Sequence, residues 1–158
     1  MRAEYINPFI ASLSRAFQTM LDCEVHRGPL LLKSQQTDHF DISGIIGLSG
    51  KAVGMVVLRL SAEVAKRATS AMLLCETDEI AADVIDAVGE LTNVVAGSAK
   101  AELAELDMMV SLPNVITGPD HAIRFPSNVT PICVPFKTEW GGLALEVGLA
   151  PAREPTFV

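Results

Sequence analysis

The sequence predicts one α+β domain, in which a mostly antiparallel sheet is covered on one face by helices. Two pairs of apolar segments are each joined by a short glycine-containing connection, which is typical of β-hairpins. Three further segments repeat apolar residues every three or four positions, as amphipathic helices do. The chain has 158 residues, 49% apolar and 20% charged, and can therefore bury one core.

The first helix is expected to start at Asn7 and Pro8 and to end near Asp22. Asn caps free amide groups, and Pro fits the first helical turn. A hairpin is expected from residues 40–48 and 52–60, on either side of Gly50. The other expected strands are 30–32, 108–117 and a second hairpin, 129–138 with 143–149.

Two more helices are expected between the hairpins. Ser61 is a typical capping residue for a helix over 62–74. Thr77, followed by two acidic residues, is a typical start for a third helix running to Leu106. This third helix would be far longer than the average of about 11 residues.

The third helix is expected to have a dry side and a polar side, because each residue turns the helix by about 100°. One narrow strip carries Glu79, Asp83, Asp86, Glu90, Asn93 and Gly97. Gly89 and Gly97 flank Asn93 at four residues each, although an interior glycine costs roughly 0.5–1 kcal/mol relative to alanine. Two interpretations remain open: a smooth groove where another macromolecule docks, or close helix packing within this protein.

The charge balance argues against nucleic acid and anionic membranes as partners. Acidic residues exceed basic ones by enough to give a net charge of −7, so the surface repels phosphates. The amino terminus lacks the apolar stretch of a signal peptide, and no apolar run suits a membrane span. A cytoplasmic location is therefore expected.

Several common chemistries lack support in the sequence. The three cysteines are far apart and are expected to be buried thiols, and no metal site is expected. The histidines are scattered, without the i, i+4 pairing of metal ligands. Neither a nucleophile elbow nor a glycine-rich phosphate loop occurs.

Three segments of the chain resemble the CheX-like members of the CheC, CheX and FliY phosphatases of bacterial chemotaxis. They are residues 6–10 (INPFI), 89–97 (GELTNVVAG) and 112–118 (LPNVITG). The second is similar to the family's Glu-x-x-Asn active segment. The resemblance implies a CheX-like phosphatase domain over 5–150. Residues 151–158 match no pattern of the family and are expected to form a loose tail.

The resemblance implies a hydrolase that removes the aspartyl phosphate of a CheY-type receiver. Asn93 would orient the attacking water, and Glu90 would pair with the receiver's lysine. A carboxamide can orient a water molecule because it both donates and accepts hydrogen bonds. Positioning supplies most of what phosphoryl transfer needs. Asp83, Asp86, Gly89 and Gly97 are the expected partner-binding residues.

The resemblance also implies a homodimer joined through sheet edges. No cofactor of its own is expected, and Mg²⁺ is expected in the receiver.

CheC members carry two Glu-x-x-Asn segments. No second copy is expected within residues 1–40, which places the chain closer to CheX. The alternative is a non-catalytic module of the same fold that binds a receiver or the flagellar switch.

Overall fold

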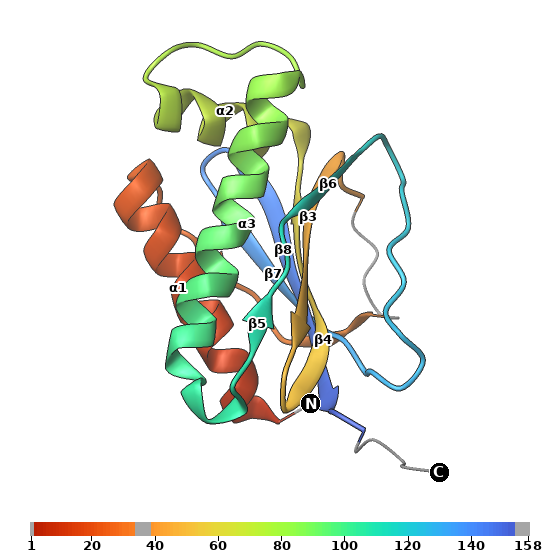
Figure 1. Ribbon diagram of the computed structural model, residues 1–158. Coiled ribbons are helices and arrows are strands. Elements are labelled where there is room, and N and C mark those ends of the chain that lie inside the picture. The colour runs from red at the N-terminus through yellow and green to blue at the C-terminus, as the bar shows by residue number, and fades with distance from the viewer. Residues whose placement is uncertain (1, 34–38, 154–158) are drawn as a thin grey trace.

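The computed structural model of the chain describes residues 2–33 and 39–153, which form helices packed on one face of a sheet (Figure 1). This is the predicted α+β architecture. The helices are α1 Ala3–Leu21, α2 Ala62–Leu73 and α3 Ala82–Glu102. The strands are β1 His26–Arg27, β2 Leu31–Leu32, β3 Ile42–Ser49, β4 Ala52–Leu60, β5 Met109–Val110, β6 Asn114–Thr117, β7 Ile132–Thr138 and β8 Gly141–Pro151.

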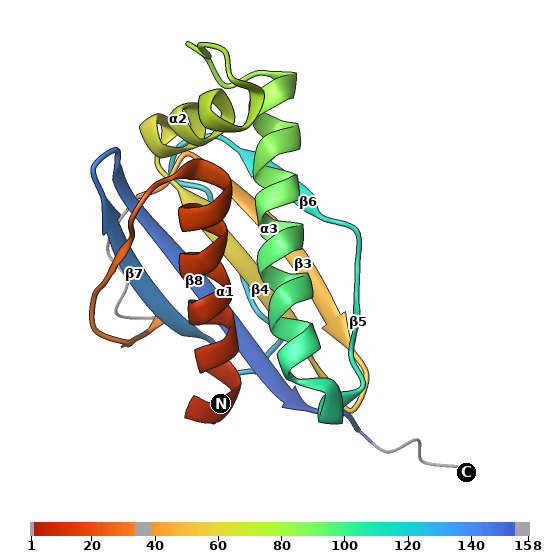
Figure 2. The same cartoon turned by 90° about the vertical axis from the view of Figure 1, so that its left-hand side faces the viewer.

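The sheet is antiparallel throughout the described residues, with the order β1-β7-β8-β4-β3-β5. β2 also pairs with β7, and β6 also pairs with β3, so each edge is made of two short strands. Figure 2 shows α1 and α3 side by side across the sheet, with α2 at one end. The core lies between this helical layer and the sheet.

Both predicted hairpins are confirmed. β3 and β4 pair from Ile42 opposite Leu60 to Leu48 opposite Gly54, close to the expected bounds. β7 and β8 form the second hairpin. β8 continues through Pro151, and the Ala152 N–H donates to Lys51 O at 2.9 Å, so the chain stays bound to the sheet beyond residue 151. The rest of the expected tail, residues 154–158, lies outside the described residues.

The predicted start of the first helix is wrong. α1 begins at Ala3, so Pro8 lies inside it and Asn7 is not its cap. Ile6 and Phe9 are fully buried on the same side of the helix, and burying Ile6 keeps the preceding turn helical. The predicted end is confirmed, since Asp22 is the C-cap, in the left-handed region with φ 48°.

The second helix has the predicted cap, and the third does not. Ser61 Oγ accepts a hydrogen bond from the Val64 N–H at 3.3 Å. Thr77, however, lies in the connection between α2 and α3, where its N–H donates to Ser70 Oγ at 3.0 Å. α3 starts five residues later and ends at Glu102, before a short 3₁₀ turn over Ala104–Leu106.

The strand expected over 108–117 is two short strands. β5 and β6 both pair with β3 but are separated by residues 111–113. Pro113 has no N–H to give to a ladder, which accounts for the break. Within the break, Ser111 still bonds to Gly47 on β3 through both its N–H and its hydroxyl, at 2.9 Å each.

The sheet face opposite the helices holds a buried ionic cluster beneath the connection between β6 and β7. Glu146 on β8 is fully buried. Its carboxylate accepts hydrogen bonds from Arg59 Nη1 at 3.1 Å and from Lys33 Nζ. A buried carboxylate needs such partners because leaving one unpaired is costly.

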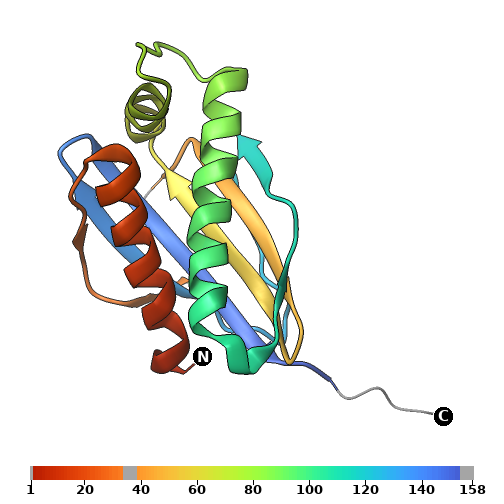
Figure 3. The same cartoon turned by 60° about the vertical axis from the view of Figure 1, so that its left-hand side comes forward.

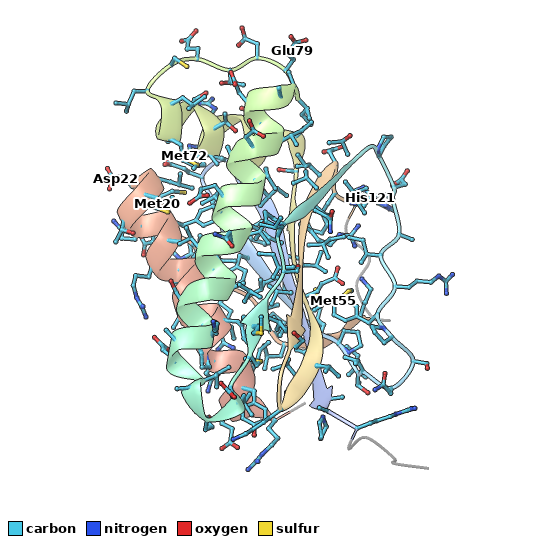
Figure 4. All side chains as sticks on the ribbon, in the orientation of Figure 1. Met20, Asp22, Met55, Met72, Glu79 and His121 are labelled. Atoms are coloured by element: carbon cyan, nitrogen blue, oxygen red, sulfur yellow. The ribbon has the colours of Figure 1, made fainter. Side chains whose placement is uncertain are left out.

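A serine and a histidine meet beside this cluster. Ser43 Oγ lies 2.7 Å from His121 Nε2, and His121 Nδ1 lies 2.7 Å from Gly118 O. Because a carbonyl only accepts, Nδ1 donates to Gly118 O, which fixes the orientation of the ring toward Ser43. Ser43 is fully buried, so this contact is structural; Figure 4 labels His121 on the side away from the helices.

The expectation for the cysteines is correct for two of the three. Cys23 and Cys133 are buried, and burial raises the pKa of the Cys23 thiol. Cys75 is exposed because it lies just after the end of α2, in the connection to α3.

Candidate functional site

The outward face of α3 carries the predicted site residues. Asp83, Asp86, Glu90 and Asn93 are all exposed, while Val84, Val88, Leu91 and Val95 of the same helix are fully buried. The predicted division into a wet and a dry side is therefore confirmed within α3. Glu79 does not belong to the strip: it precedes the helix, in the connection at the top of Figure 4.

A close contact between α3 and β3 holds the helix at the height of Glu90 and Asn93. Thr92, between these two residues, is buried, and its hydroxyl donates to Val88 O at 2.7 Å. It packs on Gly44 of β3, where a β-carbon would overlap the Thr92 hydroxyl and lie 2.9 Å from Thr92 Cβ. Only glycine allows this approach, so Gly44 fixes the position of the exposed pair.

The two glycines beside Asn93 have different surroundings. Gly89 is buried, and a β-carbon there would lie 3.6 Å from both Pro113 Cγ and Val115 Cγ2. Gly97 is half-buried, and a β-carbon there would meet nothing within 4 Å. Of the two interpretations left open by the sequence, Gly89 therefore fits packing within the protein, and Gly97 adds open surface next to Asn93.

The acidic side chains of this face have no cationic partner among the described residues. The ion pairs of that part of the chain do not involve Asp83, Asp86 or Glu90. Acids that neutralise no cation of their own are available to a basic partner, and they raise its encounter rate through long-range attraction.

The described residues contain no group of three or more His, Cys, Asp or Glu side chains arranged to hold a metal ion. They also contain no helix with the length and apolar character needed to cross a bilayer.

At its centre the site offers one carboxylate, Glu90, and one carboxamide, Asn93, three residues apart on α3. Such a pair can make a directional ionic contact and orient a water molecule.

Comparison with known proteins decides the family. The family model described as "Chemotaxis phosphatase CheX" matches residues 42–137, a segment that includes Glu90 and Asn93. The chain belongs to the CheX family. The resemblance and the fold predicted from the sequence are both confirmed.

The relatives of this CheX chain include both sequences and solved structures. The "CheY-P phosphatase CheX" of Thermotoga maritima is 29% identical over 134 residues, which cover 78% of this chain and 82% of that protein. The CheX crystal structure from Vibrio vulnificus is 32% identical, with a TM-score of 0.88, and the match covers 94% of this chain and 100% of that one.

A CheX solved together with CheY has the same fold. The CheX-CheY-BeF3-Mg²⁺ complex from Borrelia burgdorferi matches with a TM-score of 0.81 and 22% identity, covering 94% of this chain and 99% of that one. At this identity the match speaks for the fold alone.

A second Glu-x-x-Asn lies at the amino-terminal end of the chain. Glu4 and Asn7 have the same spacing as Glu90 and Asn93, so the expectation of a single copy is wrong. Both residues are exposed, on the first turns of α1. The spacing itself is the signal in the sequence. A helix that starts only at Asn7 would leave Glu4 outside it, so the two residues are not expected to share a helix face. Membership of the CheX family now rests on the family model and not on that count.

Proposed function

We propose that this CheX chain hydrolyses the aspartyl phosphate of a CheY-type receiver, with Asn93 orienting the water and Glu90 holding the receiver. The observation that carries the proposal is the exposure of both side chains on one rigid face of α3, beside the open surface at Gly97. The family and the Thermotoga relative's name as a CheY-P phosphatase support the reaction class.

Asn93 contributes position and not strong basicity. Its carboxamide oxygen accepts a hydrogen bond from water and its nitrogen donates one, so the water is held in a defined orientation. Attack forms a bond from the water oxygen to phosphorus as the bond to the aspartyl oxygen breaks. The products are inorganic phosphate, which keeps one water proton, the receiver's carboxylate, and a proton released to solvent.

Mg²⁺ belongs to the receiver in this proposal. The Borrelia complex contains Mg²⁺ together with the receiver, and a divalent ion there would neutralise charge on the phosphoryl oxygens. This chain's own contribution is the placed water and the docking surface.

Glu90 is proposed to pair with the receiver's lysine, as the family resemblance implies. Asp83 and Asp86 precede it along the exposed face of α3 and extend the acidic surface. They steer a basic partner, and each is expected to add only about 0–1 kcal/mol to binding, the usual worth of an exposed ion pair. The homodimer and the cytoplasmic location remain predictions from the resemblance and the sequence.

Asn93→Ala tests the reaction. We expect this variant to lose about 100-fold of the stimulated loss of phosphate from the receiver, by analogy with removal of one oriented catalytic contact. The measurement is the decay of phosphorylated receiver with and without the protein. Asn128→Ala is the matched control, since Asn128 is also exposed but lies in the connection between β6 and β7.

The same assay decides between the enzyme and the binding module. If the parent protein binds a receiver without accelerating the loss of its phosphate, or if Asn93→Ala matches the parent, the proposed hydrolysis is wrong. The non-catalytic module would then be the better account.

A further inference from the structure

Leu112 is one of the most exposed apolar side chains of the described chain, with 86% of its surface accessible. It lies in the connection between β5 and β6. Figure 3 shows this connection, in teal, along the edge of the sheet next to α3. An exposed leucine alone needs no explanation. Its position next to the candidate site, and the way its backbone is fixed, make it informative.

The segment that carries Leu112 lies against the turn of α3 that carries Glu90. Pro113, the next residue, packs on Gly89, where a β-carbon would be 3.6 Å from Pro113 Cγ. Gly89 directly precedes Glu90 in the helix. A protein that covers Glu90 and Asn93 must therefore also lie over, or immediately beside, the segment with Leu112.

The backbone around Leu112 is held in place before any partner arrives. The Ser111 N–H donates to Gly47 O at 2.9 Å, and the Ser111 hydroxyl donates to Leu112 O at 2.9 Å. Pro113 fixes the following φ angle. An apolar side chain on a fixed backbone costs little ordering entropy when a partner buries it.

The polar residues of the site do not by themselves explain a lasting contact with a partner. Exposed ionic contacts are weak and screened by salt, so Asp83 and Asp86 mainly favour encounter, and Glu90 holds the receiver through a single ion pair. Protein interfaces usually combine a polar rim with apolar residues that become fully desolvated. Leu112 can supply that apolar part on the β6 side of α3.

We propose that Leu112 is the apolar anchor that the receiver buries when its phosphoaspartate reaches Asn93. This inference rests on the proposed function and adds the residue that sets receiver affinity. The occupant is the receiver and not a second copy of this chain, because Leu112 adjoins the turn that bears Glu90.

The test separates binding from chemistry. Leu112→Ser is expected to raise the KM for the phosphorylated CheY-type receiver about tenfold and to leave kcat within about twofold of the parent, since burial strengthens binding throughout the reaction. Asn93→Ala should show the reverse pattern, with a large fall in kcat. Leu74→Ser is the matched control: Leu74 is 91% exposed, at the end of α2, and the change should alter neither constant.

Each other result has a definite reading. If Asn93→Ala lowers kcat but Leu112→Ser leaves KM unchanged, the anchor is wrong and the proposed function stands. If Leu112→Ser changes the oligomeric state in size-exclusion chromatography without changing KM, this surface belongs to a second copy and the anchor is again wrong. If the parent does not accelerate dephosphorylation, the proposed function itself fails, and affinity for a receiver blocked with beryllofluoride tests Leu112 separately.

Discussion

Helices α1 and α3 occupy matching places in the two halves of the chain. They lie antiparallel and side by side on the sheet (Figure 2), with 19 and 21 residues. α1 is followed by the edge strands β1 and β2 and the hairpin β3–β4, and α3 by the edge strands β5 and β6 and the hairpin β7–β8. Each set of edge strands pairs with the first hairpin strand of the other half. Apart from α2, which has no counterpart after β8 among the described residues, the two halves share one arrangement.

The two helices share a Glu-x-x-Asn but give it different surroundings. Glu4 forms an ion pair with Arg2 at 2.6 Å, in the first turn of α1, and Asn7 is followed by Pro8. Glu90 has no such partner among the described residues and lies in the middle of α3. The two segments share a spacing but differ in the charge beside the acid, and we predict from this difference that only the α3 pair docks a receiver.

The buried faces of the two helices also differ, in the size of the side chains that pack on the sheet. α1 packs through large side chains, including Ile6, Phe9 and Phe17. α3 combines its valines and leucines with small residues, and it meets β3 where Thr92 packs on Gly44. Large buried side chains therefore hold α1 on the sheet, whereas the close approach of Thr92 to Gly44 fixes the position of α3.

Gly44→Ala is expected to have the largest effect among the tests of this comparison. The added methyl group would overlap the Thr92 hydroxyl and lie 2.9 Å from Thr92 Cβ, and because Cβ moves only with the helix backbone, α3 must shift. We expect a loss of about 1–3 kcal/mol in the free energy of unfolding, measured by urea denaturation, together with slower dephosphorylation.

Gly47→Ala is the control for that change. Gly47 is also on β3, but its β-carbon would lie 3.6 Å from Ser111 Oγ, an ordinary contact distance. The Gly47 variant should keep its stability within about 0.5 kcal/mol of the parent. Equal losses in both variants would show that close approach at Gly44 is not what positions α3.

Glu90→Lys is expected to have the next largest effect. It places a cation against the receiver's lysine, and like charges at an interface are unfavourable, so we expect roughly tenfold weaker binding. Binding is measured by titrating the receiver at fixed salt. Glu4→Lys makes the same charge change on α1 and should leave affinity within about twofold; a loss as large as that of the Glu90 variant would mean that α1 also docks the receiver.

Local signals explain which parts of the fold the sequence predicted. The hairpin around Gly50 and the Ser61 cap depend on residues close together in the chain, and both are confirmed. The start of α1 depends on burial of Ile6 against distant elements, and the start of α3 follows a connection held by Ser70. Tertiary contacts set these ends, so sequence patterns misplaced them.

The candidate site was predicted in part for a similar reason. Glu90 and Asn93 stand out through spacing and resemblance, and the exposed face of α3 follows from helical periodicity. Gly44 and Leu112 could not be recognised, because their roles depend on which strand passes under α3 and which connection lies beside it. Those neighbours are far away in the sequence, and only the sheet order brings them together.

Asn7→Ala is expected to have the smallest effect and is the sharpest test of the comparison. Asn7 is exposed and has the spacing of Asn93, but its partner acid is held by Arg2. The cationic Arg2 lies beside this acid, so the local charge attracts a lysine of the receiver less than Glu90 does, and we expect Asn7 to contribute little. Dephosphorylation by this variant should stay within about twofold of the parent in the assay used for Asn93→Ala. A fall comparable to that of Asn93→Ala would make α1 a second working site, and the two halves of the fold would then be equivalent in function as well as in arrangement.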